Sequence, residues 1–263
     1  MVQLGVKNAR FDLGDGNQVP MSQCFVRGNV MRVAIMQPTY LPWSGYFGLM
    51  DTVDVFVLLD TVQFERRSWQ QRNKIKTNQG AQWLSVPVLS KGKRDQKICD
   101  VEIDKSSDFS TAHRKSIEMS YSKTIYFKKY ANTILPLLCS PYLQLADLTI
   151  DLIHNIKAQL GISTKLIRAS EINGDGSKAD LLASLCQQLG ASSYISPPGS
   201  KEYLCQSAAF DEIGVPIRYF HFLHPEYNQQ FDSFLPYLSV VDMLFNCGEQ
   251  SLDLIRNASV LRL

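Results

Sequence analysis

A short strand, a loop, a helix and a second strand follow one another in residues 31–64, and this order constrains the fold more than any other feature of the chain. Residues 32–36 are apolar after the first position, which is typical of a strand covered on both faces of a parallel sheet. Residues 45–51 are expected to form a short helix and residues 54–59, with the letters DVFVLL, a second buried strand. Parallel strands joined by a helix are the repeating unit of α/β proteins.

The same patterns recur along the rest of the chain. Further strands are expected at residues 83–88, 99–103, 163–170, 192–196 and 215–222. Helices are expected from a cap at Asp108 to Met119, over 126–138, over 145–160 with a glycine cap at Gly161, after Ser177, and in two closing segments at 239–245 and 252–256. The predicted fold is therefore an α/β, Rossmann-like, mostly parallel sheet with helices on both faces and a helical middle segment at 108–160.

The first thirty residues differ from the rest of the chain, because the stretch DLGDGNQVPMSQ is rich in turn formers and has no clear period. We predict an N-terminal extension at 1–30 and one α/β domain at 31–263. Three interpretations of the extension stay open at this point: an upstream start that precedes the natural Met31, a flexible arm, or a short strand added to a sheet edge.

Composition excludes few functions. The chain has 263 residues and a net charge of +2, which is too small by itself to indicate a nucleic-acid partner. No run approaches the roughly 20 apolar residues of a membrane span, and the N-terminus lacks a signal-peptide pattern, so we expect a cytoplasmic protein. The six cysteines include no CxxC pair, which favours free thiols and gives no reason to expect a bound metal. The oligomeric state stays open.

The loop after the first strand holds the first group of candidate residues: Gln37, Tyr40, Gly45 and Tyr46. Such a loop lies at the carboxyl edge of a parallel sheet, where α/β proteins bind ligands. A glycine at the helix start permits close backbone approach, and free amides there can hold a phosphate. The alternative is that the aromatic side chains only pack over the sheet edge.

A basic segment follows the second strand and supplies Asp60, Arg67, Arg72 and Asn73 as candidates. Guanidinium groups suit phosphates and carboxylates, and Trp69 in the same segment can stack on a base or a sugar. Asp60 ends a strand, so it is expected near the first loop and is a candidate proton acceptor. The alternative is a solvated basic face.

Two later strand ends complete the set. Lys201 and Tyr203 follow the turn SPPGS and could close over an anion, or simply belong to a strand-helix turn. His224 follows another strand and is a candidate for acid-base chemistry, because imidazole titrates near neutral pH. Asp242 lies on an apolar helix, where we favour a structural carboxylate bonded to a neighbouring loop. Because parallel strands end at one edge, we expect the candidate site residues to meet in one cleft.

Five segments in this order, MRVAIMQPTYLPWSGYFGLM, DTVQFERRSWQQRNKI, YISPPGSKEYL, HPEYNQQF and LSVVDMLFNCG, resemble the WbqC-like protein family over nearly all of residues 31–256. The resemblance implies a role in bacterial surface-polysaccharide (O-antigen, lipopolysaccharide) biosynthesis, with a suggested transfer of glycine or a similar acyl group to an amino sugar. Small-molecule substrates, a nucleotide-sugar or an amino acid, are the partners it implies. A non-catalytic nucleotide- or sugar-binding protein of the same machinery is the alternative.

The first segment is also similar to the start of pantothenate synthetase and related nucleotidyltransferases. Where those enzymes carry His-x-Gly-His, this chain has Trp43-Ser44-Gly45-Tyr46, which keeps the glycine and replaces both histidines. This similarity implies ATP, with Mg²⁺ held by its phosphates, as the cofactor of an acyl-adenylate step. In such a step Arg67 and Arg72 stabilise phosphate charge, and His224 or Asp60 takes the proton of the attacking amine.

Overall fold

The computed structural model describes residues 10–12, 18–20, 30–231 and 233–262. Its centre is a six-stranded sheet in the order β10-β9-β8-β3-β4-β7. The strands are β3 (Arg32–Met36), β4 (Val55–Leu58), β7 (Lys165–Arg168), β8 (Ser193–Ser196), β9 (Ile217–Phe222) and β10 (Ser259–Arg262). All neighbours are parallel except β9 and β10, so the expected mostly parallel α/β sheet is confirmed.

The strand order shows where a ligand can enter. The chain passes from β3 to β4 and β7 on one side, then crosses back to β8 and β9 on the other side of β3. The loops that leave β3 and β8 therefore diverge, and they open a crevice at the carboxyl ends of these two strands.

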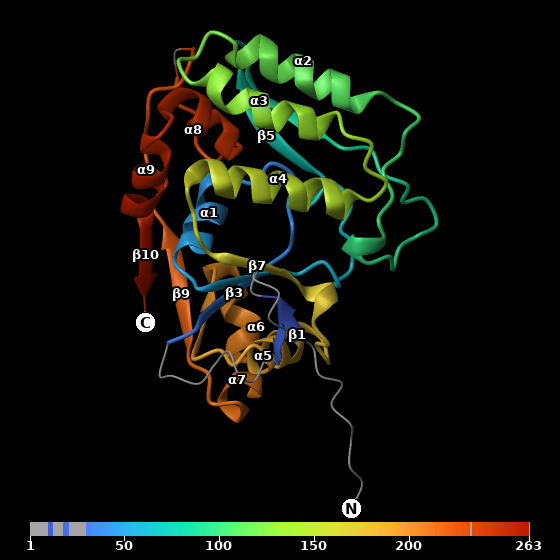
Figure 1. The fold of residues 1–263 in the computed structure, drawn as a ribbon, viewed down its shortest axis with the longest axis vertical. Coiled ribbons are helices and arrows are strands. Elements are labelled where there is room, and N and C mark those ends of the chain that lie inside the picture. The colour runs from blue at the N-terminus through green and yellow to red at the C-terminus, as the bar shows by residue number, and fades with distance from the viewer. Residues whose placement is uncertain (1–9, 13–17, 21–29, 232, 263) are drawn as a thin grey trace, which may run out of the picture.

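Helices cover both faces of the sheet (Figure 1). One face packs against α1 (Ser44–Asp51), α4 (Leu145–Leu160), α8 (Val240–Cys247) and α9 (Gln250–Ala258), with α2 (Phe109–Tyr121) and α3 (Phe127–Leu138) farther out. The other face packs against α5 (Lys178–Gln188), α6 (Lys201–Cys205) and α7 (Ala209–Glu212). Successive side chains of β3 point to opposite faces of the sheet, so the strand packs against both helical layers. Ala34 lies in the first core, while Val33 and Ile35 lie in the second.

The helical middle segment is confirmed almost to the residue. Asp108 caps α2 by accepting a hydrogen bond from the backbone N–H of Thr111, at 3.1 Å. Gly161 ends α4 in the left-handed conformation, with φ of 75°. These boundaries were predictable because caps depend on a few neighbouring residues.

Two expected strands take another form, and one strand was not expected. The strand expected at 83–88 is part of β6 (Gly80–Ser85), and it pairs with β5 (Arg72–Thr77) in an antiparallel hairpin outside the main sheet. The turn of this hairpin is closed by the Thr77 hydroxyl, which donates to the Gly80 carbonyl. The stretch 99–103 begins within a 3₁₀ turn, η2 (Ile98–Asp100), and makes isolated bridges instead of a strand. The two closing helices are followed by the edge strand β10, which was not expected.

Two short strands, β1 (Arg10–Asp12) and β2 (Gln18–Pro20), pair with each other and have no partner strand in the main sheet within the residues described. The other expectations for the N-terminal extension concern residues 1–9, 13–17 and 21–29, which lie outside the described residues. Across the parts of the chain that are described, no helix is long and apolar enough to cross a membrane.

Candidate functional site

The loop that leaves β3 is tied to the base of the β5–β6 hairpin. The backbone N–H of Tyr40 donates to the Trp69 carbonyl at 3.0 Å, and the Asn73 amide donates to the Leu41 carbonyl at 2.6 Å. Gly45 lets the Trp43 indole fold back over the start of α1, because a Cβ at that position would lie 2.2 Å from the ring. The loop thus has a fixed shape, and it separates two cavities.

The first cavity, the β3–β8 compartment, has a volume of about 310 Å³ and opens at the carboxyl ends of β3 and β8. Its apolar floor comes from the sheet and α5. Its polar lining residues are Gln37, Thr39, Glu65, Ser68, Gln70, Ser200 and Tyr203. The compartment therefore presents amides, hydroxyls and one carboxylate, and it occupies the crevice that the strand order opens.

The second cavity, the aromatic compartment, has a volume of about 350 Å³. It is lined by Met36, Thr39, Trp43, Tyr46, Trp69, Asn73 and Tyr237. Three of these residues, Met36, Thr39 and Trp69, also line the first cavity. The two compartments thus adjoin across a shared wall, and together we call them the bipartite cleft.

A chain of side-chain amides organises the polar side of the cleft. The buried Gln70 donates from Nε2 to Oε1 of Gln37 at 2.8 Å. Its own Oε1 accepts the backbone N–H of Glu65 at 2.9 Å. Gln70 thereby holds the backbone of Glu65 and the side chain of Gln37 in one arrangement.

Several residues predicted from the sequence do meet here. Gln37 and Tyr203 line the β3–β8 compartment, and Tyr46 and Asn73 line the aromatic compartment. The Tyr46 hydroxyl donates to the Gln37 carbonyl at 3.3 Å, which joins the two sets. Gly45 contributes through its contact with Trp43.

Other predicted residues lie outside the lining of the cleft. Tyr40 is fully buried, and its hydroxyl lies 2.8 Å from Nδ1 of His113 on α2. Arg67 is exposed on a left-handed turn, with φ of 60°. Arg72 packs against the Trp83 ring, and Lys201 is exposed with its ammonium 5.5 Å from the centre of the Tyr219 ring.

The buried Asp60 carboxylate accepts hydrogen bonds from structural partners. The carboxylate is fully buried and accepts from Arg168 Nε at 2.9 Å, from the Ser170 backbone at 2.9 Å and from the Ser170 hydroxyl at 2.8 Å. Arg168 also bonds Asp147 on α4 at 2.9 Å. The group joins the ends of β4 and β7, and its predicted catalytic role gains no support from this geometry.

His224 packs against Trp43 and Tyr237, two residues that line the aromatic compartment. Its ring stacks with Trp43, at 6.4 Å between centres. Nε2 accepts the backbone N–H of Tyr237 at 3.1 Å, which requires the proton of a neutral ring to be on Nδ1, 3.0 Å from the Pro225 carbonyl. Burial lowers the pKa of His224 and favours this neutral form. Nε2 is therefore engaged with Tyr237 and Nδ1 with Pro225, and the predicted acid-base role of His224 stays a prediction.

Thr39, Glu65, Gln70 and Tyr237 line the cleft but were not selected from the sequence. Thr39 and Glu65 stand close to strand ends, so position alone could have suggested them. Tyr237 had no such indication, because it comes from a long segment between β9 and α8 whose path depends on tertiary contacts.

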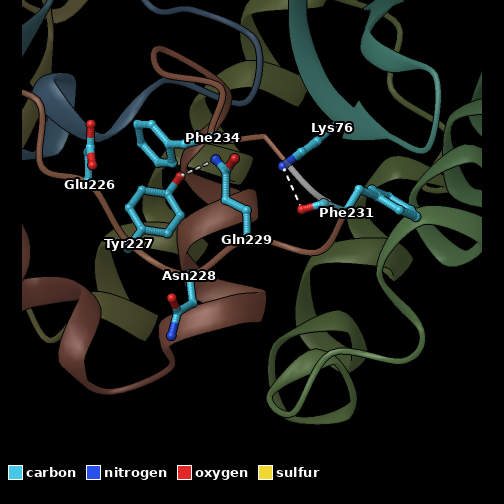
Figure 2. Close-up of a pocket in the computed structure, with 7 residues that line it drawn as sticks. All are labelled: Lys76, Glu226, Tyr227, Asn228, Gln229, Phe231 and Phe234. Atoms are coloured by element: carbon cyan, nitrogen blue, oxygen red, sulfur yellow. Dashed lines mark hydrogen bonds between the residues drawn. The ribbon is translucent and has the colours of Figure 1, made fainter.

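That segment lines a separate, open cavity of about 350 Å³, the Lys76 pocket (Figure 2). Lys76 on β5 is only 2% exposed and donates to the carbonyls of Phe231, at 3.3 Å, and of Ser233. The other lining residues are Glu226, Tyr227, Asn228, Gln229, Phe231 and Phe234. Figure 2 shows the Lys76 ammonium directed at the loop, while the Gln229 amide and the Tyr227 hydroxyl meet on the far side.

The buried carboxylate of Asp242 explains why Tyr227 and Gln229 meet. It accepts from the hydroxyls of Tyr121 and Tyr227 and from the Gln229 amide, each at 2.8 Å. Burial raises the pKa of Asp242, and these three hydrogen bonds oppose that rise. The Tyr121 hydroxyl in turn accepts the backbone N–H of Lys76 at 2.8 Å. Asp242 is thus a structural carboxylate bonded to a neighbouring loop, as expected from the sequence.

Comparison with known proteins agrees with the resemblance of the sequence motifs. The model of the WbqC-like protein family matches residues 37–254. A protein of Mycobacterium tuberculosis named "Uncharacterized protein Rv1507c" is 37% identical over 227 residues, which cover 86% of this chain and 97% of that protein. No solved structure matches the chain significantly. Because the family model matches most of the chain and the relative is 37% identical over 86% of it, the chain belongs to the WbqC-like protein family.

Proposed function

We propose that the protein is a transferase that holds two small substrates side by side in the bipartite cleft. In this proposal it acts in the cytoplasm, in bacterial surface-polysaccharide biosynthesis, and transfers glycine or a similar acyl group to the amino group of a nucleotide-linked sugar. The observation that carries the proposal is the pair of adjoining cavities that share Met36, Thr39 and Trp69 at the carboxyl edge of a Rossmann-like sheet.

The lining of each compartment suits one part of such a reaction. The rings of Trp43, Tyr46, Trp69 and Tyr237 offer faces on which a flat base or a sugar ring can stack. The amides and hydroxyls of the β3–β8 compartment suit a small polar substrate. The reacting groups would meet beside Thr39, at the wall that the two cavities share.

Amide formation needs a group that accepts a proton from the attacking amine. Glu65 is the carboxylate in the cleft lining, whereas Asp60 and His224 are already engaged in hydrogen bonds. We assign the proton to Glu65: the amine nitrogen attacks the acyl carbonyl carbon, its proton passes to the carboxylate, and the activating group leaves with the bonding electrons.

Activation of a free amino acid would need ATP and Mg²⁺, which leaves the acyl group on a phosphate. The residues expected to hold the phosphates do not fit this role, because Arg67 and Arg72 do not line the cleft. Trp43 and Tyr46, which stand where the nucleotidyltransferases carry histidines, line the aromatic compartment. The geometry therefore favours an acyl donor that arrives already activated.

The test uses the purified full chain with amino-sugar nucleotides as acceptors. One reaction contains glycine with ATP and Mg²⁺, and a second contains an activated glycyl thioester. We expect glycylated product by mass spectrometry with the thioester, and a rate about 10²–10⁴-fold lower for Glu65→Gln with nucleotide-sugar binding retained. Glu212→Gln, an exposed carboxylate on α7, is the matched control.

Asp60 and His224 already make hydrogen bonds within the protein, which leaves few acid-base groups in the cleft and favours a second function. In that case the protein is a non-catalytic nucleotide- or sugar-binding component of the same machinery. Tight binding of a nucleotide-sugar that Trp69→Ala abolishes, with no product from either donor, would establish binding alone and reject the transferase.

A further inference from the structure

The outer face of the β5–β6 hairpin carries an exposed aromatic surface beside the cleft. Trp69 is 49% exposed and Trp83 is 41% exposed, and their ring centres lie 5.3 Å apart. Trp69 also lines both compartments. The pair therefore forms a continuous aromatic surface from the mouth of the cleft onto the hairpin. Large exposed aromatic groups in contact are a feature of binding surfaces.

Two cations accompany this pair. The Arg72 guanidinium lies 4.2 Å from the centre of the Trp83 ring, and the Lys74 ammonium lies 4.7 Å from it. Lys74 is directly opposite Trp83 in the hairpin register, and Arg72 is two residues away on the same face. Arg72 Nε is buried and has no acceptor among the residues that the structure describes, so an anion would meet the outer nitrogens of the guanidinium. We name Trp69, Arg72, Lys74 and Trp83 the tryptophan platform.

The platform has clear limits. Lys76 is next along the same face of β5, but it is buried and donates to the carbonyls of Phe231 and Ser233. Asn73 and Ile75 are directed to the opposite, buried face. The accessible surface is thus two aromatic rings with two cations, which suits one or two sugar rings with an anionic group.

We propose that the tryptophan platform binds a saccharide that bears carboxylate or phosphate groups. A sugar face presents C–H groups that pack on the negative face of the Trp69 indole, and Arg72 and Lys74, which lie over the Trp83 ring, are placed for the anionic group. The inference deepens the proposed function and rests on it, because the platform would hold the charged or extended part of the sugar substrate outside the cleft.

Single-stranded nucleic acid also combines stacking with cations, but it requires a groove of positive charge along several phosphates. The platform has two cations, and the whole chain has a net charge of +2. A small acidic saccharide fits this charge better than a polynucleotide does.

The experiment measures binding by calorimetry and indole fluorescence with the full chain. The probes are trigalacturonate, its fully methyl-esterified form, a sugar 1-phosphate and a short oligo-dT. The methyl ester has the same rings without the charges, and the sugar phosphate separates a phosphate preference from a carboxylate preference. The variants are Trp83→Ala and the double variant Arg72→Gln with Lys74→Gln. Lys128→Gln, an exposed cation on α3, is the control.

We expect trigalacturonate or the sugar phosphate to bind at least about tenfold more weakly to either platform variant than to the wild type. The methyl ester should bind wild type at least about tenfold more weakly than the acid does. The double variant keeps the test decisive if Trp83→Ala fails to fold. Equal binding of acid and ester, binding that both variants retain, or a preference for oligo-dT would overturn the proposal.

The same titrations separate this inference from the proposed function. Trp83→Ala should still bind a nucleotide-sugar in the cleft, because Trp83 does not line either compartment. If no nucleotide-sugar binds while trigalacturonate binds through Trp83, the proposed function fails and the platform stands. If the nucleotide-sugar binds and no acidic saccharide does, the platform fails alone.

Discussion

At the scale of single residues, the fold keeps one histidine neutral in its core. His113 on α2 is 6% exposed, and its Nδ1 lies 2.8 Å from the Tyr40 hydroxyl. In the neutral ring Nδ1 accepts this hydrogen bond, and the ring has a further hydrogen bond to the backbone of Ser85. Burial lowers the pKa of His113 to about 4. A proton on Nδ1 would remove the acceptor that Tyr40 uses.

This histidine predicts how stability depends on pH. Between about 6.5, the ordinary pKa of histidine, and the lowered folded value of about 4, the unfolded chain binds the proton more readily than the folded chain. The free energy of unfolding should therefore fall by about 3 kcal/mol as the pH drops through this window. Urea unfolding of His113→Asn, whose amide oxygen can still accept from Tyr40, should show a flatter profile. His221→Asn controls for the residue type, and an unchanged profile in His113→Asn would contradict the prediction.

At the scale of elements, local chemistry determines the helix α4 and its end. The side chains of Leu145, Leu148, Leu152, Ile156 and Leu160 share its buried face. Gly161 then takes φ of 75°, and its N–H donates to the Ala158 carbonyl at 3.0 Å. A side chain is disfavoured in this left-handed conformation, so the glycine ends the helix at that residue.

Gly161→Ala should lower the free energy of unfolding by about 1 kcal/mol. The reason is conformational only, because a Cβ at Gly161 meets no atom within 4 Å. Gly199→Ala is a matched control, since its Cβ also meets nothing within 4 Å and its φ is not in the left-handed region. Chemical denaturation measures both variants, and equal losses would show that backbone strain is not the cause.

At the scale of the whole molecule, Asp242 joins segments that are far apart in the chain. Its three donors come from α2 and from the segment between β9 and α8, and Tyr121 extends the network to β5. Lys76 holds the same segment from the other side of its pocket. The network thereby fixes the path of the segment that carries Tyr237 into the aromatic compartment.

Asp242→Ala should cost at least about 3 kcal/mol of unfolding free energy, because it removes the acceptor of the Tyr121 and Tyr227 hydroxyls and one acceptor of the Gln229 amide. Asp95→Ala, an exposed aspartate in a loop, should change the stability by less than about 0.5 kcal/mol. Thermal and urea unfolding of both variants test this difference. A stable Asp242→Ala protein with native cooperativity would show that the segment does not depend on the carboxylate.

Much of the fold was predictable because its patterns are local. Continuous apolar runs mark β3 and β4, the cap residue Asp108 starts α2, and Gly161 ends α4. The hairpin was missed because the letters RNKIKT of β5 look like a basic loop, although Asn73 and Ile75 alternate with the cations. Its edge position allows charged residues on one face.

The α/β class and the helices that connect the parallel strands follow from the sequence by itself. The position of Gln37, Tyr46 and Tyr203 after strands also predicts that they lie at one edge of the sheet. Only the tertiary structure decided what the polar side chains do there. Asp60 and His224 looked available for chemistry, but Arg168, Ser170 and Tyr237 supply their hydrogen-bond partners from distant segments. The physical reason is that burial demands a partner for every polar group, and the identity of that partner depends on packing rather than on neighbours in the chain.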